Sequence, residues 1–458
     1  MTKTHQTFDL LRGFESRNVT FIEADGTWPL VWERAQGVHV WDADGRKYLD
    51  LTAAFGVAAA GHANPPVVRA GQRQMAKLLH AMGDVHPHAL KAQLACELSR
   101  ITFGRWATMK AEGRRRKAES GSARAKTIFC NSGFEAVEAA LKTAMLATGK
   151  RGIIAFEGAY HGLGYGALNA THREFFRAPF RSQLGEFGRF VKFPTSSTDL
   201  SKVETAIRSL FRRERVGAIL VEPIQGRGGI NIPPPKFLPL LRRLCDQHGA
   251  LLILDEIYTG FGRTGKWFAC EHGGVVPDVI CLGKALTGGF PLSACVGRAD
   301  LMDAAWPLSH GEALHTSTFL GHPVGCAMAL AQIAEIRWRK LCERSARLGE
   351  LLLRELASIR TSHFGLRTSV RGLGLMAGLE LRRADGSPAT AEAQEIIRRM
   401  LHRGFILLPE GAHSNVISFT PPLTITEAQL ARVVTALESM LSPIRAHPRP
   451  YAVSFRRS

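Results

Sequence analysis

The sequence predicts an α/β protein with an open parallel sheet, because of two apolar runs and the residues that follow them. Residues 251–254 and 279–282 have the length and composition of fully buried strands. The first run ends at Asp255, and Lys284 follows the second. Since ligands of open α/β sheets bind at the carboxyl ends of the strands, we expect these two side chains to face each other across a binding site.

Other segments add to this pattern in chain order. Residues 38–51 alternate apolar and polar side chains around an Asp-Gly turn and predict a hairpin. Residues 127–147 predict a short strand, a glycine turn and a helix whose apolar stripe includes Met145. Residues 153–156 and 218–221 indicate further buried strands.

The last third of the chain has a different character. From about residue 330 the apolar spacing is that of long amphipathic helices, and residues 370–381 then predict one further strand. The letters GLG within that strand are no dinucleotide-binding fingerprint, because they do not open a helix.

Composition and cysteine usage indicate an ordinary globular protein of a reducing compartment. The chain has 458 residues, of which 45% are hydrophobic and 22% charged. It contains no run of about 18 apolar residues that could span a membrane, and no apolar segment near the start with a cleavage site. The eight cysteines are scattered without a CxxC pair, which favours reduced thiols over disulfides or zinc ligands. We therefore expect a cytoplasmic protein without a metal.

The formal net charge of +19 raises the possibility of a nucleic-acid or membrane-surface partner. The basic residues are spread along the chain, except in residues 105–126 and in the tail at residues 445–457. Neither stretch interleaves aromatic with basic residues as a single-strand binder does. We therefore expect a solvated basic surface, with neither nucleic acid nor membrane as a partner, and a charge that suits an anionic cofactor and anionic substrates.

A buried carboxylate that faces a lysine suits pyridoxal 5′-phosphate (PLP). The lysine forms a Schiff base with this cofactor, and the carboxylate keeps the pyridine nitrogen protonated so that the ring accepts electrons. Asp255 and Lys284 are thus the candidate catalytic residues. The alternative for such a pair is a salt bridge at the strand ends.

The string that contains both residues, DEIYTGFGRTG followed by PD and GKALTGG, resembles the signature of the class III (fold type I) aminotransferases. The acetylornithine, ornithine and 4-aminobutyrate aminotransferases are of this type. The resemblance covers about residues 30–440. It implies a large PLP-binding domain at residues 71–330 with a mostly parallel seven-stranded sheet. It also implies a small α+β domain, built from an N-terminal arm and hairpin at residues 1–70 and from residues 331–458.

The resemblance also implies which residues contact PLP. NSGFEA resembles the family's phosphate loop, so the backbone of Gly133 and Phe134 is expected at the phosphate, although Phe134 replaces the usual threonine. Tyr160 of the YHG motif would stack on the pyridine ring, with Leu163 and Gly164 where relatives carry Arg-Thr. The remaining contacts by resemblance are Glu222 near the cofactor, Ile257 on the opposite ring face and Tyr258 at the ring hydroxyl.

HTSTFLGHP resembles a further family motif, whose threonine reaches the PLP phosphate of a neighbouring subunit. This position is Thr318, with Ser317 beside it. The resemblance thus implies a homodimer with composite active sites.

Two residues depart from the family pattern. Arg227 stands where relatives carry a glutamate, and Ser418 stands where they carry an arginine that binds a substrate carboxylate. This chain therefore keeps one positive charge at this pair of positions, but the charge is at position 227 instead of position 418. We infer that Arg227 is the carboxylate clamp, because its guanidinium forms a bidentate fork. The alternative is an Arg227 side chain that points to solvent.

The expected function is that of a PLP-dependent aminotransferase, which moves an amino group from an amino acid or ω-amine donor to a 2-oxo acid. Lys284 would carry the proton between the substrate and the cofactor. A racemase, epimerase, aminomutase or decarboxylase of the same class is the alternative. A non-catalytic protein that binds a partner through basic residues 114–117 is a further one.

Overall fold

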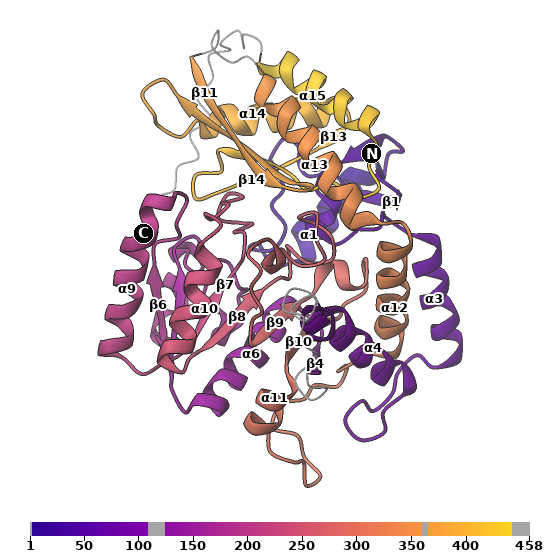
Figure 1. The fold of residues 1–458 in the computed structure, drawn as a ribbon. Coiled ribbons are helices and arrows are strands. Elements are labelled where there is room, and N and C mark those ends of the chain that lie inside the picture. Colours follow the sequence, from indigo (N-terminus) through magenta and orange to yellow (C-terminus); the bar gives the residue numbers. More distant parts are fainter. Residues whose placement is uncertain (1, 109–123, 360–364, 442–458) are drawn as a thin grey trace.

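The computed structural model describes residues 2–108, 124–359 and 365–441, and Figure 1 shows its fold. The centre of the molecule is a seven-stranded sheet with the order β4-β10-β9-β8-β7-β5-β6. Its strands are β4 (Ala125–Cys130), β5 (Gly152–Phe156), β6 (Gly188–Val191), β7 (Val216–Val221), β8 (Leu251–Asp255), β9 (Val279–Leu282) and β10 (Ser293–Arg298). The buried strands predicted from the sequence are β5, β7, β8 and β9.

The central sheet is mostly parallel, as predicted. Strand β10 pairs antiparallel with both β4 and β9, while the pairs among β9, β8, β7, β5 and β6 are parallel. Strand β4 consequently runs in the same direction as β9. Six of the seven strands therefore end at one edge of the sheet, and their following loops meet there.

Helices cover both faces of this sheet. Alternate residues of a strand point to opposite faces, so Ile153 of β5 packs with α6 (Gly133–Thr148) in one core cluster. Its neighbour Ile154 packs with α9 (Leu200–Arg213) and α10 (Phe237–His248) in another. Burial on both faces explains why these strands are apolar throughout rather than alternating.

Helix α6 packs on the sheet through small residues. Its buried face consists mainly of alanines, among them Ala136 and Ala140, which let the helix approach the strands closely. The predicted apolar stripe was too wide at one end, because Met145 is 49% exposed. The helix ends at Gly149, whose φ of +61° gives the left-handed cap that favours glycine.

Two smaller sheets complete the fold. Strands β1 (Trp32–Gln36), β2 (His39–Asp42), β3 (Lys47–Asp50) and β13 (Phe405–Ile406) form one, and β11 (Leu366–Leu373), β12 (Met376–Arg383), β15 (Val416–Phe419) and β14 (Leu408–Glu410) form the other. The predicted hairpin is β2–β3, and its second strand pairs in parallel with β13 from the C-terminal part of the chain.

The prediction of one strand at residues 370–381 was wrong. The segment is a tight antiparallel hairpin in which Leu373 of β11 pairs with Met376 of β12. Gly374 makes the turn with a φ of +55°, and a Cβ there would lie 2.4 Å from the carbonyl carbon of Thr264. A glycine that serves a turn and a close backbone contact at once is hard to distinguish, in sequence, from a glycine inside a strand.

The longer helices outside the central layers are α1 (Lys3–Phe14), α3 (Pro65–Lys77), α4 (Ala89–Ser99), α12 (Pro323–Trp338), α13 (Leu341–Ser358), α14 (Thr390–His402) and α15 (Glu427–Leu441). Helices α3 and α12 lie side by side at the edge of the molecule (Figure 1). The domain boundaries predicted after residues 70 and 330 fall inside these two helices, and they stay predictions.

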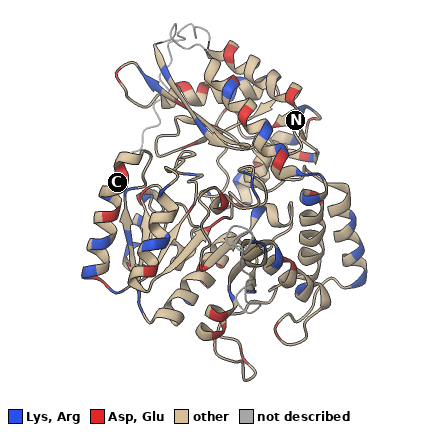
Figure 2. Cartoon of the chain, viewed as in Figure 1, with Lys and Arg blue, Asp and Glu red and all other residues tan. Residues whose placement is uncertain are grey.

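Charged residues of both signs are distributed over the whole fold. Figure 2 shows Lys and Arg interspersed with Asp and Glu on helices of the central and the smaller layers. The basic stretch at residues 114–117 and the basic tail lie outside the described residues. Within the part of the chain that the structure describes, no helix is long and apolar enough to cross a membrane. All eight cysteines are free thiols, and only Cys96 is exposed.

Arg263 joins the central layer to the smaller sheet. It lies in the loop after β8 and is 2% exposed. Its Nη1 donates hydrogen bonds to the carbonyl oxygen of Leu375, at 2.9 Å, and to that of Pro421. Burial lowers the pKa of Arg263 to about 10, because Tyr258 and Asp50 offset only part of the loss of water around the guanidinium. The two carbonyls come from segments far along the chain, so one side chain holds three segments together.

We predict that Arg263→Met lowers the free energy of unfolding by about 1–3 kcal/mol, because two buried carbonyls lose their charged donor. Urea unfolding followed by circular dichroism measures the change. Arg347→Met is the matched control, since Arg347 is exposed and pairs with Glu427 at the surface, where an ion pair contributes about 0–1 kcal/mol. Equal effects of the two substitutions would contradict the role of Arg263.

Candidate active site

The predicted catalytic residues lie at the ends of adjacent strands. The order β9-β8-β7-β5 brings together, at one edge, Lys284 after β9, Asp255 at the end of β8, Glu222 after β7 and Tyr160 after β5. All four strands run in the same direction, so their polar ends share one side of the sheet. This arrangement is the one that the sequence predicted for Asp255 and Lys284.

Asp255 is fixed by two hydrogen bonds. Its Oδ2 lies 2.8 Å from Nδ1 of His161, and its Oδ1 accepts from the backbone N–H of Ile257 at 3.1 Å. Both side chains of the Asp255–His161 pair are buried. In the sequence, His161 stands out only as part of the YHG motif. Nothing in the sequence indicates its contact with Asp255.

Glu222 is a buried acid with two backbone donors. Its carboxylate accepts from the N–H of Tyr160 and from the N–H of Gly226, both at 3.0 Å. Burial raises the pKa of Glu222. The acid thereby ties the loop after β5 to the loop after β7.

Lys284 is unusual in its backbone conformation and in the pKa of its amine. Its φ of +44° is in the left-handed region, which is uncommon outside glycine and clusters at functional sites. Its Nζ lies 3.7 Å from the centre of the Tyr258 ring. Burial lowers the pKa of Lys284 from its ordinary value of 10.5 to about 8, although Asp255 and Glu222 raise it in part. The amine is therefore neutral in half of the molecules at about pH 8.

A candidate anion site lies beside these residues at the start of α6. The first backbone N–H groups of a helix lack partners within the helix and attract anions. Ser132, which precedes the helix, makes no capping hydrogen bond to them, since its hydroxyl donates to Glu135 instead. The N–H groups at Gly133 and Phe134 are thus available to a phosphate.

Phe134 packs against the loop after Tyr160. A Cβ on Gly162 would lie 2.3 Å from the Cβ of Phe134, and a Cβ on Gly164 would lie 2.5 Å from the Phe134 ring. The phenylalanine at the threonine position and the glycine at position 164 are therefore linked by contact. The Phe134 side chain has room because both neighbouring residues are glycines, which carry no side chain.

Ile257 and Tyr258 follow Asp255 and line the same space. Ile257 is 3.1 Å from the place where a Cβ on Gly133 would lie, and 3.4 Å from that on Gly283. It thus packs between the anion site and Lys284. The Tyr258 hydroxyl lies 3.2 Å from the Thr420 hydroxyl, and burial raises the pKa of Tyr258 to about 12.

Tyr160 lies in a row of aromatic and basic side chains. The Arg227 guanidinium is 5.4 Å from the centre of the Tyr160 ring. On the other side, Tyr160 meets Phe176 at 5.7 Å, and the guanidinium of Arg173 lies 5.6 Å from Phe176. Cations over ring faces at these separations are attracted by the ring quadrupole.

Glu410 completes the charged groups of the site, and no sequence signal indicated it. It ends β14, next to the strand that carries Ser418. Its Oε2 lies 3.4 Å from Nε of Arg227. Burial raises the pKa of Glu410 to about 7, against the opposing effects of Arg227 and Lys284. Ser418 itself is buried and donates to the carbonyl oxygen of Leu408 at 3.0 Å, so it supplies no charge.

Ser317 and Thr318 lie in an exposed loop. The Ser317 hydroxyl is 3.2 Å from Nδ2 of Asn131, the first residue after β4. This contact brings the loop to the anion site of the same chain. Among the described residues, Thr318 forms no hydrogen bond or ion pair with the other residues of the site.

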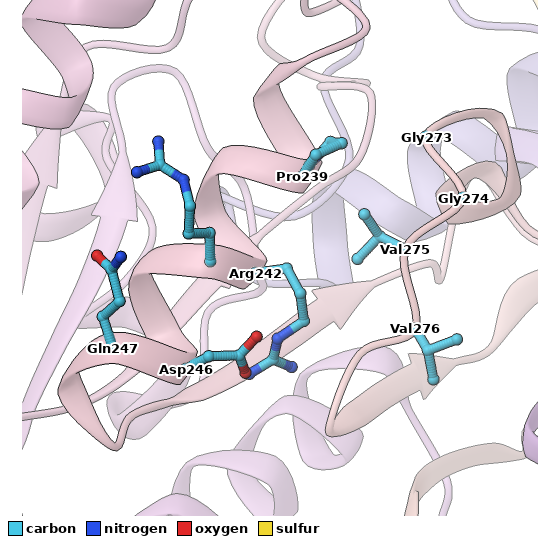
Figure 3. Close-up of a pocket in the computed structure, with 9 residues that line it drawn as sticks. Pro239, Arg242, Asp246, Gln247, Gly273, Gly274, Val275 and Val276 are labelled. Atoms are coloured by element: carbon cyan, nitrogen blue, oxygen red, sulfur yellow. The ribbon is translucent and has the colours of Figure 1, made fainter.

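A surface pocket of about 510 Å³ lies elsewhere. Figure 3 shows it between α10, with Pro239, Arg242, Asp246 and Gln247, and the loop at residues 273–276. None of its lining residues belongs to the site around Lys284. Arg242 forms ion pairs with Asp246 and Asp278, so the structure explains its charge without a ligand.

The residues of the site fit PLP. An amine of lowered pKa, a buried acid on the adjacent strand and an uncapped helix start are the groups that would suit its aldehyde, its ring nitrogen and its phosphate. The fold and the site together define a PLP-dependent transferase of fold type I.

Comparisons with known proteins give the family. The chain matches the family model for class III aminotransferases over residues 21–441. The acetylornithine aminotransferase of Methanosarcina mazei is 37% identical over 413 residues, which cover 90% of this chain and 92% of the relative. The putrescine aminotransferase of Pectobacterium atrosepticum is 37% identical over 429 residues, covering 92% and 85%. A solved PLP-bound amine transaminase from an uncultivated Pseudomonas species has a TM-score of 0.80 at 29% identity, covering 93% of this chain and 98% of that one.

This chain belongs to the class III aminotransferases. It is a PLP-dependent enzyme that transfers an amino group from an amino acid or ω-amine donor to a 2-oxo acid. The fold, the cofactor and the activity predicted from the sequence are confirmed.

The lowered pKa of Lys284 gives a pH-dependent prediction. In the cofactor-free protein, acetylation of Lys284 needs the neutral amine, so its rate should rise with a midpoint at about pH 8. Asp255→Asn should move the midpoint to lower pH, because Asp255 raises the pKa of Lys284. Mass spectrometry of the modified peptide measures the rate, with the exposed Lys266 as reference. A midpoint near the ordinary lysine value of 10.5 would contradict burial of the amine.

Proposed function

We propose that Lys284 is the lysine that holds PLP covalently and that Asp255 is the acid at its ring nitrogen. The observation that carries this proposal is the placement of a lysine of lowered pKa and a buried acid at the ends of adjacent parallel strands. Bound PLP supplies the electron sink for the bond that breaks at the substrate carbon. Asp255, oriented by His161, keeps a positive charge at the ring nitrogen favourable.

Lys284 also serves as the proton carrier in this proposal. With a substrate bound in its place, the amine of Lys284 would be free beside the reacting carbon. An amine with a pKa of about 8 exchanges protons readily near neutral pH, which is the condition for effective general acid–base catalysis. The transfer between the substrate carbon and the cofactor carbon thus needs no second base.

The other predicted contacts follow the same placement. Gly133 and Phe134 would offer backbone N–H groups to the phosphate at the start of α6, and Ile257 would cover one face of the ring. Tyr160 would cover the opposite face. Glu222 would lie near the cofactor and Tyr258 at the ring hydroxyl.

We predict that Lys284→Ala abolishes covalent attachment of the cofactor. Borohydride reduction followed by denaturation should leave PLP on the wild-type chain and none on the variant. Transaminase activity should fall at least about 1000-fold, because the variant loses both the attachment and the proton carrier. Lys266→Ala is the control, since Lys266 lies in the loop after β8 and its amine donates to the carbonyl of Glu271. Cofactor that stays attached in Lys284→Ala would place the reactive lysine elsewhere.

We infer that Arg227 is the clamp for a substrate carboxylate. Its guanidinium lies over Tyr160, the residue proposed to cover the cofactor ring, and its side chain is 37% exposed. It is therefore held near the reacting atoms and remains accessible to a ligand. A bidentate pair with a carboxylate would give the guanidinium hydrogen bonds that its Nε lacks among the described residues.

Arg227→Ala should raise the Michaelis constants for 2-oxo acids about 10- to 100-fold, because a charge-assisted pair is lost. The kcat for an amine without a carboxylate should change little. Steady-state kinetics with a panel of 2-oxo acids measures both values. Unchanged Michaelis constants for every 2-oxo acid would show that Arg227 only faces solvent.

We further propose a homodimer in which Thr318 of one subunit reaches the PLP phosphate of the other. The segments around this loop expose large apolar side chains, including Leu79, Met82, Leu314 and Phe319, and an exposed apolar patch of this kind suits a protein interface.

The free thiols support the expectation of a reducing, cytoplasmic location. The absence of a nucleic-acid partner stays a prediction.

A further inference from the structure

Glu410 differs from the other buried acids around the active site in its hydrogen bonds. Glu256, next to Asp255, accepts from two backbone N–H groups and one hydroxyl. Glu222 accepts from two backbone N–H groups, and Asp255 has two donors of its own. Among the described residues, no donor forms a hydrogen bond to the Glu410 carboxylate, although Glu410 is only 4% exposed.

The single partner of Glu410 is held loosely. The Arg227 Nε lies 3.4 Å from Oε2, and this nitrogen has no hydrogen-bond acceptor in the part of the chain that the structure describes. An ion pair removed from water is favourable only when hydrogen bonds of good geometry satisfy both charges. The Arg227–Glu410 pair does not meet this condition. Both groups therefore have binding capacity left for a ligand.

The two charges are close together and lie near the site around Lys284. A Cβ on Gly226, the residue before Arg227, would lie 2.4 Å from the Tyr258 ring, and Nζ of Lys284 lies 3.7 Å from the centre of the same ring. From the smaller sheet, Glu410 brings its carboxylate to Arg227. Arg227 faces it from the loop after β7. An acid and a guanidinium a few ångströms apart are complementary to an ammonium and a carboxylate that are borne by one carbon atom.

We propose that Arg227 and Glu410 together bind the zwitterionic head of a diamino monocarboxylic acid, whose distal amine reacts at Lys284. Glu410 accepts hydrogen bonds from the α-ammonium group, and Arg227 donates to the α-carboxylate. This inference rests on the proposed function, and it names the substrate class of the same site. Glu410 thereby selects donors with a second ammonium group.

The zwitterion explains both charges better than a ligand with one charge does. A donor with only a distal carboxylate leaves Glu410 buried without a hydrogen-bond donor. A donor with only a distal ammonium places a cation beside Arg227. Unpaired buried charges of either kind cost binding free energy.

The experiment compares three donors that differ only in the head group. These are L-lysine, ε-aminocaproate, which lacks the α-amine, and cadaverine, which lacks the carboxylate. The holoenzyme is mixed with each donor without a 2-oxo acid, and the cofactor absorbance gives kcat/KM for the donor half-reaction. We expect the wild type to prefer L-lysine over both others by about 10-fold or more, because one charge-assisted contact is lost in each.

Two substitutions separate the two contacts. Glu410→Gln should lower kcat/KM for L-lysine and cadaverine about 10- to 100-fold and leave that for ε-aminocaproate unchanged or higher. Arg227→Gln should lower the values for L-lysine and ε-aminocaproate and spare cadaverine. Glu380→Gln is the matched control, because Glu380 lies on β12 of the same sheet, where it pairs with Arg371 and Arg382, outside the catalytic site.

Each outcome decides one of the two proposals. If none of the three donors, nor any other amine, changes the cofactor absorbance of the wild type, the proposed function fails. If the donors react but the wild type shows no preference among the head groups, or Glu410→Gln lowers all three values equally, the zwitterion site is refuted. Should Glu410→Gln not fold, the wild-type order and Arg227→Gln still decide.

Discussion

The amine of Lys284 is half neutral at about pH 8 because the fold removes it from water, and this burial is the constraint on which the site depends. An ammonium group in such a place is costly unless negative charges lie nearby. The parallel sheet supplies these charges at little structural cost, since Asp255 and Glu222 end the two strands that follow β9 in the sheet order. The two acids limit how far burial lowers the pKa of Lys284. The amine therefore titrates in the range where it can act both as a nucleophile and as a base.

The same constraint shapes the surroundings of the amine. The loop after β5 contacts both acids, through His161 at Asp255 and through the N–H of Tyr160 at Glu222, so it ties the loops after β7 and β8 together. Arg263 then connects the loop after β8 to the smaller sheet. The smaller sheet carries Glu410, and the rigid central edge carries Lys284 and Arg227. In the binding mode that we propose, the substrate head group would thus meet residues from two layers, while the reacting atoms would meet residues from one.

The parts of this arrangement that depend on local pattern could be predicted from the sequence. Apolar runs of strand length gave β5, β7, β8 and β9, and the polar residues directly after them gave Asp255, Lys284 and their common edge. What depends on contacts between distant segments could not be predicted. His161 is one polar residue in a loop until β8 places Asp255 beside it. Glu410 follows an apolar stretch like many surface acids, and only the pairing of β14 with β15 shows that it lies beside Arg227. The hairpin at Gly374 was missed because its glycine is required by the backbone of Thr264, which lies far away in the sequence.

The packing of Phe134 against Gly162 and Gly164 has a consequence for the evolution and the engineering of this enzyme. A side chain introduced at position 164 alone would collide with the phenylalanine ring, whereas a smaller residue at position 134 removes this obstacle. The two positions are therefore epistatic: the effect of a side chain at position 164 depends on the residue at position 134. Libraries that vary single positions around the cofactor would reject a side chain at position 164, whereas libraries that vary positions 134 and 164 together could accept it.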